Sequence, residues 1–254
     1  MDVTFGQIAV ILLAGFLAGI VNTLAGGGSF LTLAALDMVG LPVTMANGSN
    51  RLAVLVGDIM AAAGFRSKGM FSFRLSLHFA IPALFGAVLG AYLVIDLPEL
   101  VFQRLLGITM LIMLVVLIVN PKKWLEGRPV VLTWKRRILT YLVFFGVGIY
   151  GGAIQAGVGL FLIIALVLTS GVDLVEANMH KVFVVGTYTV FALGTFALYG
   201  QVHWGMGAIM AIGSATGSWF TSRLAVERGQ GFVRLVLGIA LVILSARYLG
   251  LFGM

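Results

Sequence analysis

Two basic side chains stand inside long apolar runs of this chain, where a charge is costly. Arg51 closes the stretch ANGSNR at 46–51, and Lys181 closes the stretch ANMHK at 177–181. An ionisable residue at membrane depth is by default a functional-site hypothesis. A guanidinium can hold an oxyanion through two parallel hydrogen bonds, and an ammonium acts as a point charge. The two cations therefore predict a site for a small anion; the alternative for each is snorkelling to the interface.

Polar residues beside these cations are the next candidates for substrate binding. Asn47 and Asn178 occupy equivalent places ahead of the cations, where they either bind the anion or cap their helices. His180 either titrates near the site or is a hydrogen-bonded structural histidine. The predicted binding set from these two stretches is Arg51, Lys181, Asn47, Asn178, Ser49, Asn50 and His180.

Asp58 is the acidic residue that lies well inside a long apolar run. It follows Arg51 by seven positions, so the two side chains lie on nearly the same face of a helix. Two roles are open. Asp58 either neutralises the buried cation or serves as a carboxylate that couples transport to a proton.

Two glycine clusters, at 22–29 and 155–159, each precede an apolar run too short to cross a bilayer. Irregular backbone at membrane depth is tolerated only inside protein or beside a wet cavity. A helix that starts there aims its free amides and its positive dipole end at the break, which suits an anion. The alternative is a hinge that lets helices cross closely, as expected for scattered glycines such as Gly86, Gly90 and Gly107. The binding set therefore also includes Gly27, Gly28, Ser29, Gln155 and Gly159.

The composition specifies the kind of protein that must position these residues. Of 254 residues, 61% are hydrophobic and 10% are charged, far from the quarter charged that is typical of soluble domains. Cysteine is absent and the three histidines are far apart, so we expect no metal site, no cofactor and no catalytic residues. The net charge of +7 lies mainly in loops, which indicates membrane topology rather than nucleic-acid binding.

Apolar runs predict an all-α polytopic membrane protein with about eight long spans and two short segments. The short segments are 29–39 and 160–170. The long runs are 5–25, 45–65, 75–95, 100–119, 138–157, 177–198, 204–226 and 231–251.

The two halves of the chain repeat each other at an offset of 131 residues. The shared residues include Ala25 with Ala156, Gly26 with Gly157, Gly28 with Gly159, Asn47 with Asn178 and Gly86 with Gly217. We therefore expect a first transmembrane repeat at 1–119, a basic cytoplasmic linker at 120–137 and a second repeat at 138–254.

Loop charges indicate that these repeats are inverted. The linker 120–137 and the loops 66–74 and 223–234 are basic, and so are expected in the cytoplasm. Loop 197–205 has no Lys or Arg and loop 94–104 carries two acids, so both are expected outside. Each loop thus changes side between repeats, as in many secondary transporters. Both termini then face outward, and each glycine-broken pair crosses an even number of times.

This organisation favours a secondary transporter that works by alternating access. A passive anion channel is the alternative, and an intramembrane hydrolase built on Ser49 and His180 is a weaker one. The chain has no Walker motif, so ATP is not its energy source. The expected partners are a small anion, the lipid bilayer, a coupling proton or sodium ion, and a second copy of the chain if it forms homo-oligomers; no nucleic acid is expected.

As a set, these motifs resemble the sulfite exporter TauE/SafE family of membrane permeases. The likeness rests on AGGGSF at 25–30, ANGSNR at 46–51, GGAIQAGVG at 151–159 and EANMHK at 176–181. It extends over both halves of the chain, although many members have a Gly-Thr-Ser type run at 47–50. The resemblance implies a multi-pass protein of the plasma (inner) membrane that moves sulfite, organosulfonates or related anions.

Overall fold

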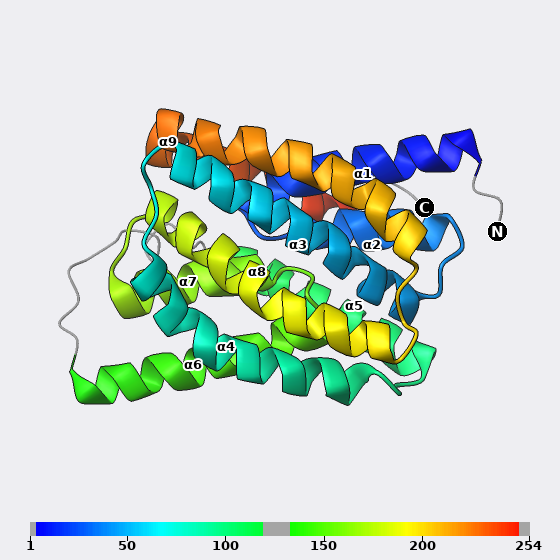
Figure 1. Cartoon of the computed structure of the whole chain (residues 1–254), viewed down its shortest axis with the longest axis horizontal. Coiled ribbons are helices and arrows are strands. Elements are labelled where there is room, and N and C mark those ends of the chain that lie inside the picture. The colour runs from blue at the N-terminus through cyan, green and yellow to red at the C-terminus, as the bar shows by residue number, and fades with distance from the viewer. Residues whose placement is uncertain (1–3, 119–132, 249–254) are drawn as a thin grey trace.

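A computed structural model of the chain is helical throughout the part that it describes (Figure 1). It describes the backbone of residues 4–118 and 133–248, and the side chains of 4–109, 112 and 133–228. The linker residues 120–132 and the last predicted residues of the final span, 249–251, lie outside this description. The helices are α1 (Phe5–Leu24), α2 (Ser29–Met38), α3 (Val43–Ser67), α4 (Phe73–Val94), α5 (Glu99–Ile118), α6 (Trp134–Ala153), α7 (Val158–Ser170), α8 (Leu174–Leu198) and α9 (Trp204–Tyr248).

Among the described residues, α1, α4 and α8 are long and apolar enough to cross a membrane by themselves. Helix α3 has 25 residues, but Arg51, Asp58 and Arg66 lower its hydropathy. The number of eight long spans therefore stays a prediction.

Residues 204–248 form one element, α9, which includes the predicted run 204–226 and the described part of the predicted run 231–251. The intervening residues 227–230 contain no proline and include Glu, Arg and Gln, which are good helix formers. In Figure 1 the orange part of α9 crosses the molecule and its red part returns, so this segment still crosses twice.

The predicted short helices are confirmed as α2 and α7. At 1.5 Å per residue they are about 15 and 20 Å long, against a hydrocarbon core of about 30 Å. The chain reverses before each of them, and left-handed backbone makes the turn: φ is 77° at Gly26 and 78° at Gly157. In Figure 1, α1 and α2 form one hairpin, and α6 and α7 form a second hairpin from the opposite end of the molecule.

The long helices of the two hairpins pack on helices from the other half of the chain. Helix α9 packs on α1 and α3, and α4 packs on α6 and α8. Glycines permit these close approaches, since a Cβ on Gly86 or Gly90 would overlap α6 backbone and one on Gly152 would overlap α4 backbone. Close packing is thus confirmed for Gly86 and Gly90, whereas no atom of the described residues lies against Gly107.

Contacts between the loops sort them to two ends of the molecule. Lys68 Nζ lies 2.6 Å from Glu227 Oε1, which joins the basic loops 66–74 and 223–234. At the other end Tyr92 and Tyr199 pack edge to face with ring centroids 6.4 Å apart, at the ends of α4 and α8. The ends therefore group as the loop charges predict.

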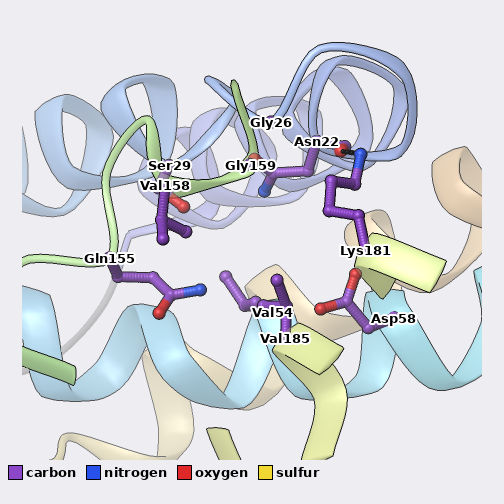
Figure 2. A pocket seen from close by; sticks show the side chains of 10 residues that line it. All are labelled: Asn22, Gly26, Ser29, Val54, Asp58, Gln155, Val158, Gly159, Lys181 and Val185. Atoms are coloured by element: carbon purple, nitrogen blue, oxygen red, sulfur yellow. Dashed lines mark hydrogen bonds between the residues drawn. The ribbon is translucent and has the colours of Figure 1, made fainter. Parts of the chain in front are cut away.

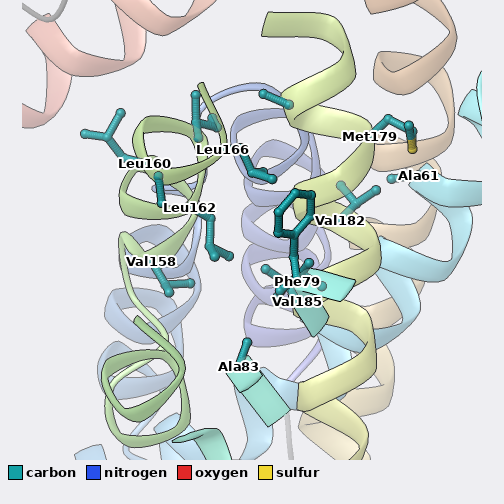
Figure 3. Packing of buried hydrophobic residues seen from close by; sticks show 14 of the residues in the cluster. Ala61, Phe79, Ala83, Val158, Leu160, Leu162, Leu166, Met179, Val182 and Val185 are labelled. Atoms are coloured by element: carbon teal, nitrogen blue, oxygen red, sulfur yellow. The ribbon is translucent and has the colours of Figure 1, made fainter. Parts of the chain in front are cut away.

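Helix α7 forms the centre of a buried apolar cluster. Its Leu160, Leu162 and Leu166 are almost completely inaccessible to solvent. Figure 3 shows this short helix beside Phe79 of α4 and Val182 of α8. A helix that is apolar on all faces belongs inside a helical assembly, and this one holds the second glycine break in a fixed place.

Candidate functional site

A small cavity with both polar and apolar side chains lies between the two chain breaks and the long helices α3 and α8 (Figure 2). The space that the centre of a water molecule can occupy inside it is about 10 Å³. The cavity therefore has room for about one water molecule. It is lined by Asn22, Gly26, Ser29, Val54, Asp58, Gln155, Val158, Gly159, Lys181 and Val185. Both halves of the chain therefore contribute to one site, and both breaks open onto it.

The two breaks touch each other at Gly26 and Gly159. A Cβ built on Gly26 would overlap the Cα of Gly159, and a Cβ on Gly159 would overlap the Cα of Gly26. Only glycine at both positions lets the backbones approach this closely. The first break therefore directly abuts the start of α7.

Lys181 reaches from α8 to the end of α1. Its Nζ donates to the carbonyl oxygens of Asn22 and Thr23, at 2.6 and 2.7 Å, and to Oδ1 of Asn178 at 2.8 Å. An ammonium has three protons to donate, and each has an acceptor here. The positive charge also lies at the C-terminal, negative end of the α1 dipole. Lys181 thus closes the end of the broken helix from the first half.

Arg51 makes the corresponding contact with the second half. Its guanidinium donates to the carbonyl oxygens of Gly151 at 3.1 Å, of Gly152 at short range, and of Ala153 at 3.4 Å, all in the last turn of α6. The ring of Phe196 lies 4.4 Å from the guanidinium carbon, which adds a cation–π contact. Arg51 has 0% exposure, so this is a fully buried cation and not one that snorkels.

Asp58 faces the cavity together with Lys181 and does not pair with Arg51. Its charged neighbour is Lys181, yet within the described residues no ion pair closer than 4 Å joins them. Figure 2 shows why: the Lys181 ammonium points toward Asn22, away from the carboxylate. Oδ2 of Asp58 is buried without a hydrogen-bond partner in the described part of the chain. A buried oxygen of this kind is costly and is suited to a proton or a cation.

Gln155 connects Arg51 to the cavity. Its backbone is left-handed with φ of 66°, the one described non-glycine residue with this conformation. Its Oε1 accepts from Tyr188 Oη at 3.2 Å and weakly from Arg51 Nη1 at 3.5 Å. A left-handed backbone at a non-glycine residue is strained, and strain that the fold maintains indicates a functional constraint.

Several predicted site residues lie beside the cavity without lining it. Asn47 donates from Nδ2 to the carbonyl of Ala153, and Asn50 Oδ1 accepts from Thr32 at 2.6 Å. These two side chains connect α3 to the adjoining break and half-helix. Gly27 and Gly28 are buried in the first break, where a Cβ on Gly28 would overlap Ala18.

The structure does not bring Ser49 and His180 together. Ser49 Oγ accepts from the backbone amide of His203 at 2.8 Å, at the start of α9. His180 Nδ1 lies 2.8 Å from Ser76 Oγ on α4. The two residues therefore connect different helix pairs and form no dyad for hydrolysis.

Sequence reasoning missed Tyr188, Phe196 and Thr32. Tyr188 had a signal: it follows Lys181 by seven residues, as Asp58 follows Arg51. At an offset of 130 both pairs align, one position away from the main repeat. Phe196 and Thr32 carry no such signal, because aromatic and hydroxyl side chains are common in apolar helices.

Comparison with known proteins agrees with this architecture. The family model of "Sulfite exporter TauE/SafE" matches residues 11–248. The chain is 28% identical to "Probable membrane transporter protein ORF9" from Sinorhizobium sp, over 98% of the chain and 94% of that protein. It is 28% identical to a "Probable membrane transporter protein" of Haemophilus influenzae, over 97% and 96% respectively.

It is also 29% identical to "Probable membrane transporter protein YfcA" of Escherichia coli K12, over 95% of the chain and 89% of that protein. No solved structure matches the chain significantly. The family model extends over nearly the whole chain, through both hairpins and the cavity between them. The chain therefore belongs to the sulfite exporter TauE/SafE family and is a multi-pass membrane transporter, not an enzyme.

Proposed function

We propose that this protein moves a small oxyanion, sulfite or an organosulfonate, across the plasma membrane by alternating access at the cavity between the breaks. The observation that carries the proposal is the reciprocal arrangement of the two buried cations. Lys181, from the second half, holds the end of α1, and Arg51, from the first half, holds the end of α6. Each half thus supplies a charge that the broken helix of the other half requires.

This arrangement explains how an anion could be admitted and released. Both cations donate to backbone carbonyl oxygens, although Arg51 Nε has no partner among the described residues, and the cavity is too small for a sulfonate group. An anion must therefore displace carbonyl partners of Lys181 while the breaks move apart. Several of the first amides of α2 and α7 donate to carbonyl oxygens of the preceding breaks, and once the breaks move apart these amides can face the anion. Opening toward one side at a time is the alternating access that an inverted repeat supports.

The second feature that supports coupled transport is the Asp58 oxygen in the same cavity, which has no hydrogen-bond partner among the described residues. A carboxylate beside the Lys181 chain can take up a proton or coordinate a sodium ion when the anion draws the ammonium away. A passive channel has no need for such a group. We therefore place the coupling ion, a proton or sodium, at Asp58.

A flux assay in proteoliposomes tests the proposal. Uptake of sulfite, sulfoacetate, taurine and sulfate is measured with and without a pH or sodium gradient, with protein-free liposomes as the control. We expect saturable, gradient-driven accumulation of sulfite or a sulfonate, and counterflow when unlabelled anion is present on the far side. Ohmic currents that do not saturate would instead establish a channel, and no flux of any of the four anions would reject this substrate class.

A further inference from the structure

A second, larger cavity lies away from the central site, at the end of the molecule that carries the basic loops. It lies between the first turns of α4 and α6 and the last residue of α7. The space that the centre of a water molecule can occupy inside it is about 380 Å³. The cavity is lined by Arg74, Leu75, His78, Phe79, Arg137, Thr140 and Ser170. None of the described residues that line it is acidic.

The cavity carries two positive charges without counter-charges. Arg74 and Arg137 are exposed and belong to the first turns of two helices, where the dipoles also present their positive ends. Within the part of the chain that the structure describes, neither arginine has an ion pair. His78 Nδ1 lies 3.1 Å from Tyr141 Oη, which holds the imidazole at the cavity wall. The chemistry of the lining is that of a site for an anion with several oxygens.

The size and walls of the cavity select among anions. Leu75 and Phe79 make part of the wall apolar, and the volume exceeds what one sulfite or phosphate ion fills. Trp134 starts α6 with 69% of its surface exposed, and tryptophan is typical of the level of lipid headgroups. A ligand with an anionic head and an apolar tail matches both parts of the lining. Basic cavities between membrane helices on the cytoplasmic side commonly hold such headgroups.

We propose that the cavity of Arg74 and Arg137 binds the phosphate headgroup of an anionic phospholipid such as phosphatidylglycerol. The two guanidinium groups hold the phosphate oxygens, and the acyl chains follow the apolar surface of α4 and α6. The site also has a connection to the transport cavity. Phe79 packs edge to face on His180, with centroids 5.8 Å apart, and His180 directly precedes Lys181. A lipid bound here therefore steadies the helix that carries the central ammonium.

Thermal unfolding of the purified full chain in detergent tests the proposal without a transport assay. The midpoint is measured against increasing phosphatidylglycerol, phosphatidylcholine, inorganic phosphate and sulfite. We expect a saturable rise with phosphatidylglycerol and none with phosphatidylcholine. Each of Arg74→Gln and Arg137→Gln should weaken the apparent affinity about ten-fold, as expected for the loss of one charge-assisted hydrogen bond. The double variant should lose the preference for the anionic lipid.

The matched control is Arg66→Gln with Arg223→Gln, which removes the same charge from the same end of the molecule. These two arginines lie over Phe71 and Trp219 instead of lining the cavity, so the lipid response should be retained. Arg66, Lys68, Lys135 and Arg136 remain in the cavity double variant and preserve the topology signal. An unchanged lipid response in the cavity variant would overturn the site. An equal, arginine-dependent rise with phosphate or sulfite alone would overturn the lipid and assign the cavity to the small anion.

Discussion

The backbones of Gly26 and Gly159 are in direct contact, with no room for a side chain on either residue. They belong to different halves of the chain and to the two breaks that face the central cavity. Any movement of one hairpin must therefore act on the other at this point. In a transporter that alternates between two openings, this contact is where the halves must separate or slide.

Replacing Gly159 by Ala tests that contact without adding backbone strain, because Gly159 is not in the left-handed region. The new methyl group would overlap Gly26, so we expect Gly159→Ala to lower the thermal midpoint and abolish flux in proteoliposomes. Gly194→Ala on α8 is the control, since that position has open space. There the substitution should be neutral or stabilise by up to about 1 kcal/mol. Parental flux in Gly159→Ala would show that the contact is not needed.

A related pair separates contact from conformation at the first break. Gly26 and Gly69 have the same φ of 77°, but only Gly26 is packed against another backbone. An alanine costs about 1–2 kcal/mol at either position through the left-handed conformation alone. We expect Gly69→Ala to lower the thermal midpoint only by as much as this cost implies and to keep parental flux. Gly26→Ala should lower the thermal midpoint further and abolish flux. Equal defects in the two variants would attribute the effect to conformation.

Gln155 holds a left-handed conformation that glycine would adopt without strain. Gln155→Gly should therefore relieve about 1–3 kcal/mol of local strain, partly offset by the lost bond from Tyr188. We expect a thermal midpoint near that of the parent with strongly reduced flux, because the amide that faces Arg51 and the cavity is gone. Tyr188→Phe, which removes only the donor to Gln155, should show a smaller flux defect. Normal flux in Gln155→Gly would leave the side chain without a role in transport.

Arg51 lets charge be separated from hydrogen-bond geometry. Its guanidinium donates from two nitrogens to three consecutive carbonyls at the end of α6, whereas a lysine donates from one nitrogen and lacks this planar geometry. Arg51→Lys should therefore keep the charge but lose thermal stability and most of the flux. Arg51→Gln should lose nearly all flux, since each charge-assisted bond contributes about 1.5–3 kcal/mol. Arg104→Gln, at an exposed position on α5, should behave like the parent. Membrane-inserted Arg51→Gln with unchanged flux would exclude Arg51 from the site.

The sequence predicted the fold features that depend on local chemistry. The glycine clusters and the short apolar runs after them identified α2 and α7, and the loop charges sorted the two ends. It could not predict the backbone carbonyls that Arg51 and Lys181 contact, because a carbonyl has no sequence signature. Asp58 was expected near Arg51 from helix periodicity, but its carboxylate faces Lys181 from the other half. Such contacts across halves depend on how the hairpins pack, which spacing within one helix does not reveal.

The sidedness of the loops can be measured directly in this cysteine-free chain. Single cysteines at positions 68 and 128 should label with a membrane-impermeant reagent from the cytoplasm, and those at 98 and 201 from outside. Positions 68 and 201 fall at opposite ends of the molecule in the loops after α3 and α8. Labelling of 68 and 201 from the same side would contradict the inverted arrangement. Intact cells and inverted vesicles supply the two orientations for comparison.

Variants of Asp58 and Lys181 test whether the cavity couples the movement of the anion to the movement of a proton or sodium ion. If Asp58 carries the coupling ion, Asp58→Asn should abolish gradient-driven accumulation while exchange at equal concentrations persists. If it only offsets the ammonium, the variant should lose stability, and adding Lys181→Gln should restore part of that stability, because the second change removes the uncompensated charge. Exposed Asp96→Asn is the control for both measurements. The coupling role predicts that the double variant stays unable to accumulate anion whatever its stability. Gradient-driven accumulation by Asp58→Asn at the parental level would remove Asp58 from the mechanism and leave Lys181 as an isolated buried cation.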